Sequence, residues 1–387
     1  MASPMNRRAW LKTSTLLSSG FTFLSGSLTG LTASAAPAAR VRTLTDAEFQ
    51  KAAPLQLKAR LFANENPFGP SEKAKRAILE SLTNSYQYPL SDIEAMAEKI
   101  TAFEGLQKGM VMMASGSSPI LMAAAMCFCK EGDSVISADP SYADLPEHAV
   151  DFKAKWIKVP LTSDYKLDLD AMEKAITSTT KLVYVCNPNN PTATIVDTAK
   201  LKDFCERVSK KVAVFVDEAY IDYLPDPQAT TLIESVKKGQ NIIVARTFSK
   251  LYGFAGLRIG YMVAQPEMVK KLEPYCVGWI GISGPSISAA LVSYQDKEFL
   301  QSALQKTQAS KEYLYKILKQ EGYEYIPSSA NFVMFPLKMD GKRFTDEMMK
   351  RGVGVRNWEF NNKQWCRVSI GRQDEMEAFA AAFKELS

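Results

Sequence analysis

The sequence predicts an α/β protein, with a mostly parallel central sheet in a large domain and a smaller α+β domain beside it. Short β-branched runs alternate with helical stretches of suitable length, which is typical of a parallel sheet. These runs are apolar almost throughout, as expected for strands covered on both faces. Beyond Pro266 the pattern becomes more helical. With 387 residues, 46% of them hydrophobic, the chain can bury a large core without disulfides or metals.

The N-terminal segment has the pattern of an export signal. Asn6 to Lys12 open it with Arg7, Arg8 and Lys12, about twenty uncharged residues follow, and the Ala-Ser-Ala at 33–35 suits a cleavage site. The paired arginines resemble a twin-arginine signal, with Asn6 where Ser or Thr is usual. We therefore predict that residues 1–35 are a signal peptide and that the mature protein is periplasmic or otherwise exported, with no stable membrane span. A retained N-terminal helix and a cytoplasmic location are the alternatives.

The mature chain begins with an arm, residues 36–70, that we expect to contribute partly to the smaller domain. The large domain is predicted over residues 71–285. Helical spacing appears at 71–80 and 92–103, where Ser91 or Asp92 offers an N-cap for the second helix. Five β-branched runs follow as predicted strands, at residues 135–138, 156–159, 182–185, 212–216 and 242–245.

The smaller domain is predicted over residues 286–387. After a helix at 267–272, we expect one long helical segment at 286–320, a weak strand at 331–335, short strands at 354–356 and 366–370, and a final helix from Asp374. No internal repeat is visible after the signal.

Composition argues against several classes of partner. The net charge of +5 includes the basic N-terminal segment, and charges of both signs alternate elsewhere, so we infer no nucleic-acid partner. His148 is the single histidine, so we expect no metal site, although a ligand or base role for it is the alternative. The cysteines lack zinc-type spacing and suit buried free thiols, or disulfides in an oxidising compartment. They are Cys127, Cys129, Cys186, Cys205, Cys276 and Cys366.

Polar residues follow three successive predicted strands, at the sheet edge where α/β proteins bind ligands. Each motif alone suits a turn or an N-cap. Their order is informative: a pyridine cofactor with a phosphate needs an imine-forming lysine, an acidic partner for its ring nitrogen, donors for its phenolic oxygen, and hydroxyls with an arginine for its phosphate. The chain offers these groups as Asn190, Asp217, Tyr220, Ser249, Lys250 and Arg258.

These motifs resemble those of fold-type I enzymes that depend on pyridoxal phosphate (PLP), in the class I/II aminotransferase superfamily. The closest match in motif is to histidinol-phosphate aminotransferases. The resemblance extends from residues 63–70 to residues 367–371, nearly the whole mature chain, and includes the Asn-Pro-Asn-Asn-Pro-Thr at 187–192 and the Ser-Lys at 249–250. It implies the fold-type I architecture, PLP as cofactor, and ping-pong transfer of an amino group to a 2-oxo acid.

The resemblance also implies roles for single residues. Lys250 would form the Schiff base with PLP and, once released, move the proton of the substrate. Asp217 would pair with the ring nitrogen. Asn190 and Tyr220 would donate to the ring hydroxyl oxygen, and Tyr142 would stack on the ring face. The resemblance implies that Lys250, Asp217 and Tyr220 are the catalytic residues.

A phosphate site is expected from helix physics as well as from the resemblance. Ser117 and Ser118 precede the apolar helical stretch 120–128, so their N–H groups would point at an anion at a helix N-terminus. Tyr88 resembles the tyrosine that family members extend to the phosphate of a partner subunit, which implies a homodimer. Three side chains of the chain itself would complete the cup: Thr247, Ser249 and Arg258.

Substrate recognition is expected from Arg367, at the family position that binds an α-carboxylate, with Arg356 and Asn66 as further candidates. A plain strand arginine on the surface is the alternative for both arginines. Two departures from the family pattern, Pro119 and Ala193, indicate a divergent branch. Since an exported protein would not meet a biosynthetic phosphate ester, we expect an amino acid, aromatic or otherwise apolar, rather than histidinol phosphate.

Other chemistry on the same scaffold stays open from the sequence. A PLP-dependent lyase or decarboxylase shares these motifs, because the bond that breaks depends on how the substrate is oriented over the ring. A non-catalytic PLP-binding sensor is a third possibility, although no DNA-binding helical pair precedes residue 60 and the catalytic set is intact.

Overall fold

The computed structural model describes residues 57–387, which form one compact unit. The predicted signal peptide, its cleavage site and most of the predicted arm lie outside the described residues. Within the described range, no helix is long and apolar enough to cross a membrane.

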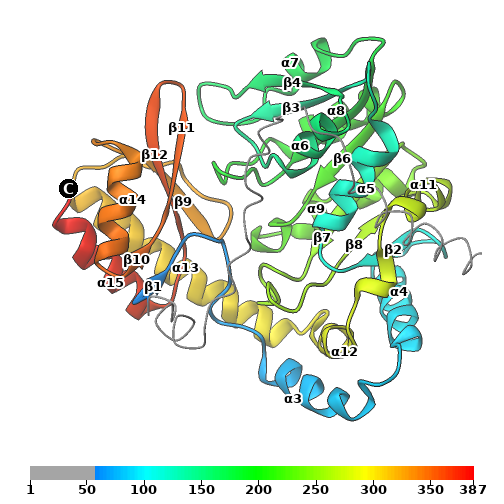
Figure 1. Ribbon diagram of the computed structural model, residues 1–387, viewed down its shortest axis with the longest axis horizontal. Coiled ribbons are helices and arrows are strands. Elements are labelled where there is room, and N and C mark those ends of the chain that lie inside the picture. Colours follow the sequence, from blue (N-terminus) through cyan, green and yellow to red (C-terminus); the bar gives the residue numbers. More distant parts are fainter. Residues whose placement is uncertain (1–56) are drawn as a thin grey trace, which may run out of the picture. The chain divides into compact units, whose positions relative to one another are not determined.

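A seven-stranded sheet forms the centre of the large domain, in the order β2-β8-β7-β6-β5-β3-β4 (Figure 1). Five adjacent strands of this sheet are parallel, and they are the five strands that the sequence predicts: β3 (Ser134–Asp139), β4 (Lys155–Pro160), β5 (Thr180–Cys186), β6 (Ala213–Asp217) and β7 (Ile242–Thr247). Two strands were not predicted, the edge strand β2 (Val111–Ala114) and its neighbour β8 (Gly260–Val263), and β8 runs antiparallel to both β2 and β7. With four residues each and few β-branched side chains, they offer a weak local signal.

Helices cover both faces of this sheet. On β5, Val183 and Val185 join one core layer, while Leu182 and Tyr184 join the other. The first layer includes residues of α3 (Glu72–Ser81), α4 (Leu90–Glu104), α7 (Leu169–Lys174), α8 (Thr198–Ser209), α10 (Ile233–Lys237) and α12 (Gly284–Ser293). The second includes residues of α5 (Ser118–Phe128), α6 (Asp144–Asp151) and α11 (Pro266–Leu272). This two-sided burial explains why the strands are apolar throughout.

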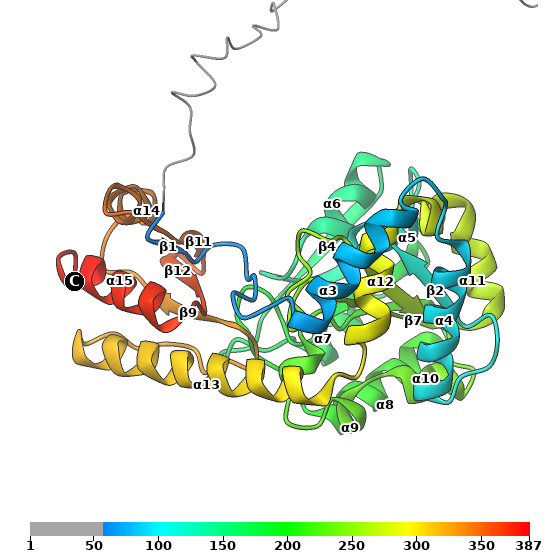
Figure 2. The ribbon, with the colours of Figure 1, turned by 90° about the horizontal axis from the view of Figure 1, so that it is seen from below.

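The smaller domain is α+β, as predicted. Its antiparallel sheet has the order β11 (Arg356–Phe360), β12 (Lys363–Ser369), β9 (Phe332–Pro336), and β1 (Ala59–Arg60) pairs in parallel with β10 (Val353–Gly354). The helices are α13 (Lys297–Gln320), α14 (Gly341–Lys350) and α15 (Gln373–Lys384). Through β1, two residues of the predicted N-terminal arm pair with a strand of this domain. Figure 2 shows α13 leading from α12 to α15.

Two local predictions were wrong. The segment 286–320 is not one helix, because α12 ends at Ser293 and the chain turns at Gln295, which has a positive φ of 65°. α12 packs on α3 and α4, so it belongs with the large sheet. The second error concerns α4, which begins at Leu90 after Pro89 and has no side-chain N-cap. Asp92 lies in its first turn, where a negative charge still suits the helix dipole.

Candidate active site

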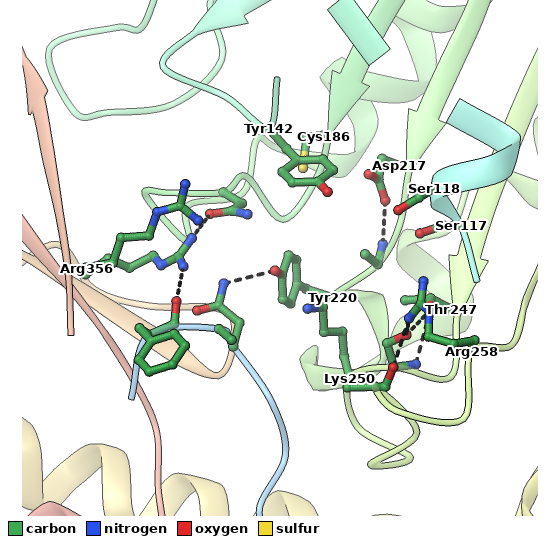
Figure 3. A pocket seen from close by; sticks show the side chains of 18 of the residues that line it. Ser117, Ser118, Tyr142, Cys186, Asp217, Tyr220, Thr247, Lys250, Arg258 and Arg356 are labelled. Atoms are coloured by element: carbon green, nitrogen blue, oxygen red, sulfur yellow. Dashed lines mark hydrogen bonds between the residues drawn. The ribbon is translucent and has the colours of Figure 1, made fainter. Parts of the chain in front are cut away.

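A cavity of about 630 Å³ lies at the carboxyl ends of β5, β6 and β7, the edge at which α/β sheets bind ligands. Figure 3 shows Arg356 at one end of the cavity, Arg258 with Thr247 at the other, and Tyr220 and Lys250 between them. All but two of the predicted site residues line it: Ser117, Ser118, Tyr142, Asn190, Asp217, Tyr220, Thr247, Ser249, Lys250, Arg258, Arg356 and Arg367.

Lys250 enters the cavity from the loop that follows β7. Its Nζ lies 5.4 Å from the centroid of the Tyr220 ring. Burial is the main cause that lowers the pKa of Lys250 to about 8, and the nearby Arg367 cation adds to the effect. A neutral amine is therefore accessible near physiological pH, as a lysine that forms an imine requires.

Asp217 ends the fully buried strand β6. Its Oδ1 accepts the Ala219 N–H at 3.0 Å, and its Oδ2 accepts the Tyr184 hydroxyl at 3.0 Å. Burial raises the pKa of Asp217 to about 6, while these hydrogen bonds and the Lys250 cation oppose the shift. The group remains mostly ionised at neutral pH and can hold a pyridinium N–H.

Arg367 connects the smaller domain to the cavity. Its Nη1 donates to Asn190 Oδ1 at 2.7 Å, and its Nη2 donates to the Phe62 carbonyl at 2.7 Å. Because the amide oxygen of Asn190 is engaged, its amide nitrogen is the end that can donate to a ring oxygen. Across the cavity, Asn64 Nδ2 donates to the Tyr220 hydroxyl at 3.0 Å.

The other end of the cavity is built to receive an anion. Arg258 Nη1 donates to Ser249 Oγ at 3.2 Å, and Thr247 Oγ1 donates to the same oxygen at 2.9 Å. Gly116, with a φ of 90°, is so close that a Cβ there would collide with the Arg258 guanidinium. Ser117 precedes α5 without capping it, and Ser117 and Ser118 both line the cavity, so the N–H groups of these two residues at the helix N-terminus suit a phosphate.

The structure does not bring Asn66 or Tyr88 into the cavity. The Asn66 amide donates to the Leu251 carbonyl and accepts the Phe68 N–H at 3.0 Å, so it stabilises a loop instead. Asn66, which was predicted to bind substrate, does not line the cavity, and Asn64 of the same motif does. Tyr88 is 80% exposed beside α4, and its predicted role in a partner subunit stays a prediction.

Sequence reasoning missed two residues that hold the site in place. Asn64 lies within the motif at 63–70, but nothing in the local sequence shows whether Asn64 or Asn66 points into the cavity. Tyr184 lies in an apolar strand, where an aromatic residue is expected for packing alone. Its hydroxyl was the one available signal, because a buried Tyr O–H needs a partner.

Comparisons with known proteins agree with this geometry. Residues 58–383 match the family model described as aminotransferase class I and II. The histidinol-phosphate aminotransferase of Moorella thermoacetica is 35% identical over 333 residues, 84% of this chain and 85% of that protein. Histidinol-phosphate aminotransferase 1 of Cupriavidus pinatubonensis is 37% identical over 333 residues, 84% of this chain and 87% of its own length.

A solved structure shows the same fold. The crystal structure of histidinol-phosphate aminotransferase from Sinorhizobium meliloti in complex with pyridoxal-5'-phosphate superposes with a TM-score of 0.80 and 23% identity, covering 93% of this chain and 100% of that one. The chain described here therefore belongs to the class I and II aminotransferases, the PLP-dependent enzymes of fold type I.

Proposed function

We propose that this aminotransferase transfers the amino group of an α-amino acid to a 2-oxo acid. The preferred amino acid has an apolar or aromatic side chain. The observation that supports this most is the composition of the cavity next to Arg367. Phe62, Met349 and Val355 line the same cavity as Arg367, and Asp217 is the one acidic residue among the described residues that line it. Such a wall suits an apolar side chain next to a carboxylate.

PLP, when bound, supplies an electron sink that accepts the electron pair of the substrate bond that breaks at Cα. We assign each part of the cofactor to the residues around it. Lys250 holds it and moves the proton between Cα and the cofactor, while Asp217 keeps the ring nitrogen protonated. Asn190 and Tyr220 bind the ring hydroxyl, and Tyr142 packs on the ring face. The phosphate is assigned to the cup made by Ser117, Ser118, Thr247, Ser249 and Arg258.

Arg367 is the proposed carboxylate ligand. A guanidinium has five N–H donors, and the two hydrogen bonds to Asn190 and Phe62 use two of them. Donors on Nη1 and Nη2 therefore remain for a carboxylate. These two bonds also hold the side chain in place, so the substrate does not have to order it.

Histidinol phosphate is the second candidate, because curated relatives of 35% and 37% identity are named for it. Arg356 would bind its phosphate, since this exposed arginine also lines the cavity. A lyase or decarboxylase on this scaffold is less favoured, because the family model and these relatives are aminotransferases.

The substrate proposal is tested by mixing the holoenzyme with phenylalanine, leucine, aspartate and histidinol phosphate and following the cofactor absorbance. We expect phenylalanine or leucine to convert it to the amine form fastest. Arg367→Gln should lower kcat/KM for the amino acid about 100-fold, because it removes a charged partner of the carboxylate. Arg356→Gln should change it less than threefold. Faster conversion by histidinol phosphate, with a large loss in Arg356→Gln, would select the second candidate.

We further propose a homodimer. Large apolar side chains are exposed on the segments around α3, α4, α5 and α12, which is unusual for a monomer surface. The set includes Leu79, Leu82, Tyr86, Tyr88, Leu90, Met122, Met126, Val277, Trp279, Ile280 and Val292. A second copy of the chain is the proposed partner, because Tyr88 would then be able to reach the other subunit's phosphate cup.

Ile280→Glu is expected to weaken this dimer at least 100-fold, because an unpaired carboxylate would be buried at the interface. Light scattering across a dilution series measures the change. Ile280 is 64% exposed, and the matched control is Val150→Glu, since Val150 is 48% exposed on α6. A wild-type protein that stays monomeric at all concentrations would contradict the proposal.

We also propose export, supported by the Arg7-Arg8 pair and the Ala-Ser-Ala at 33–35. In cells that make the full-length chain, replacing Arg7 and Arg8 by lysine is expected to retain the protein inside as the uncleaved precursor. Cell fractionation with immunoblotting distinguishes the outcomes. Wild-type chain that fractionates with cytoplasmic markers at precursor size would favour the cytoplasmic alternative.

A further inference from the structure

Tyr184 lies beneath the cofactor-binding edge of the sheet, and its hydroxyl reaches Asp217. We propose that Tyr184 is a positioning residue, which orients the Asp217 carboxylate toward the ring nitrogen of PLP and keeps the shared proton on that nitrogen. This inference rests on the role proposed above for Asp217.

Strand pairing places Tyr184 in reach of the carboxylate. On β5 and β6, Cys186 lies opposite Asp217 and Tyr184 lies opposite Phe215. The Tyr184 ring packs against Phe215, with centroids 5.9 Å apart, and only 1% of the residue is exposed. Its hydroxyl donates to Asp217 Oδ2 at 3.0 Å. Because the ring is held by packing, the hydroxyl is fixed before any cofactor or substrate binds.

The two hydrogen bonds that Asp217 accepts define the direction of its carboxylate. The Ala219 N–H occupies one lone pair of Oδ1, and the Tyr184 hydroxyl occupies one of Oδ2. Ionised carboxylate oxygens have about four lone-pair sites in all, so acceptor positions remain for the ring N–H. Tyr184 is the side chain, among the described residues, that donates a hydrogen bond to Asp217.

The charge of Asp217 depends on the same contact. Burial raises its pKa, and the Asp144 carboxylate of α6 acts in the same direction. The Tyr184 hydroxyl is the strongest opposing contribution to this pKa, followed by the Ala219 N–H and the Lys250 cation. Without the hydroxyl, Asp217 becomes a stronger base than before and competes more strongly with the ring nitrogen for the proton. A less protonated ring is a poorer electron sink.

The test uses Tyr184→Phe holoenzyme loaded with PLP that carries ¹⁵N in the ring. We expect the ¹⁵N resonance to move toward the value of neutral pyridine, and the half-reaction with the best amino acid to slow about tenfold or more, the factor expected for losing a hydrogen bond to a charged group. Tyr294→Phe is the matched control. It also removes a buried tyrosine hydroxyl, one for which the described residues offer no hydrogen-bond partner, and it should leave the resonance unchanged.

A second variant keeps the test decisive if Tyr184→Phe folds poorly. Difluorotyrosine at position 184 has a more acidic hydroxyl, and we expect it to shift the ¹⁵N resonance in the opposite direction. An unchanged resonance, with a rate within twofold of wild type, in both variants would overturn the inference. Asp217→Asn separates failure of the role proposed for Asp217 from failure of the role inferred for Tyr184. If Asp217→Asn also leaves the resonance unchanged, the role of Asp217 fails. If Asp217→Asn alone moves the resonance, only the role of Tyr184 fails.

Discussion

Lys250→Ala is expected to abolish transamination, with a loss of at least about 10⁴-fold, because the variant lacks both the amine that holds the cofactor and the base that moves the proton. The absorbance band of the lysine-bound cofactor should also disappear, while PLP can still bind through the phosphate cup. A spectrum in the presence of PLP, followed by single-turnover kinetics with an amino acid, measures both effects.

Lys311→Ala is the control for this experiment. Lys311 is also a buried lysine with a pKa that burial lowers to about 8, but its Nζ donates to the carbonyls of Ser328 and Ala330 outside the cavity. That variant should lose stability and keep the cofactor band. If Lys250→Ala retained the band and Lys311→Ala lost it, the assignment of the cofactor lysine would be wrong.

Asp217→Asn is expected to reduce the rate of the half-reaction by about 10²- to 10³-fold, since breaking a buried charged pair costs roughly 3–5 kcal/mol. The amide is close in shape to the carboxylate, so the fold should be retained. Unlike the carboxylate, it cannot stabilise a protonated ring nitrogen. Stopped-flow absorbance with the amino acid preferred by the wild type provides the rate.

Asp222→Asn provides the matched control for the Asp217 variant. Burial raises the pKa of Asp222 to about 6, as it does for Asp217, but Asp222 lines a separate cavity of about 240 Å³ with Arg246 and Tyr294. We expect its half-reaction rate to stay within threefold of wild type. Equal losses in both variants would mean that Asp217 acts through general stability and not through the cofactor ring.

The local sequence was sufficient for the five parallel strands and for most of the groups at their ends. A buried parallel strand must be apolar on both faces, so its run of β-branched residues is visible without neighbours. The loop after each such strand reaches the same edge of the sheet, so Asn190, Asp217 and Lys250 could be expected to lie together. The antiparallel strands β2 and β8 were missed because their pairing partners, not their own residues, determine their conformation.

The sequence by itself determined the family, the cofactor and the main chemical groups, because each of these depends on residue type and on order along the chain. Only the tertiary structure decided which groups meet. It turned Asn64 rather than Asn66 into the cavity, engaged Arg367 with Asn190, and brought the Tyr184 hydroxyl to Asp217. These contacts join residues 33 to 185 positions apart. Such distances in sequence leave no local pattern, since tertiary packing brings the residues together.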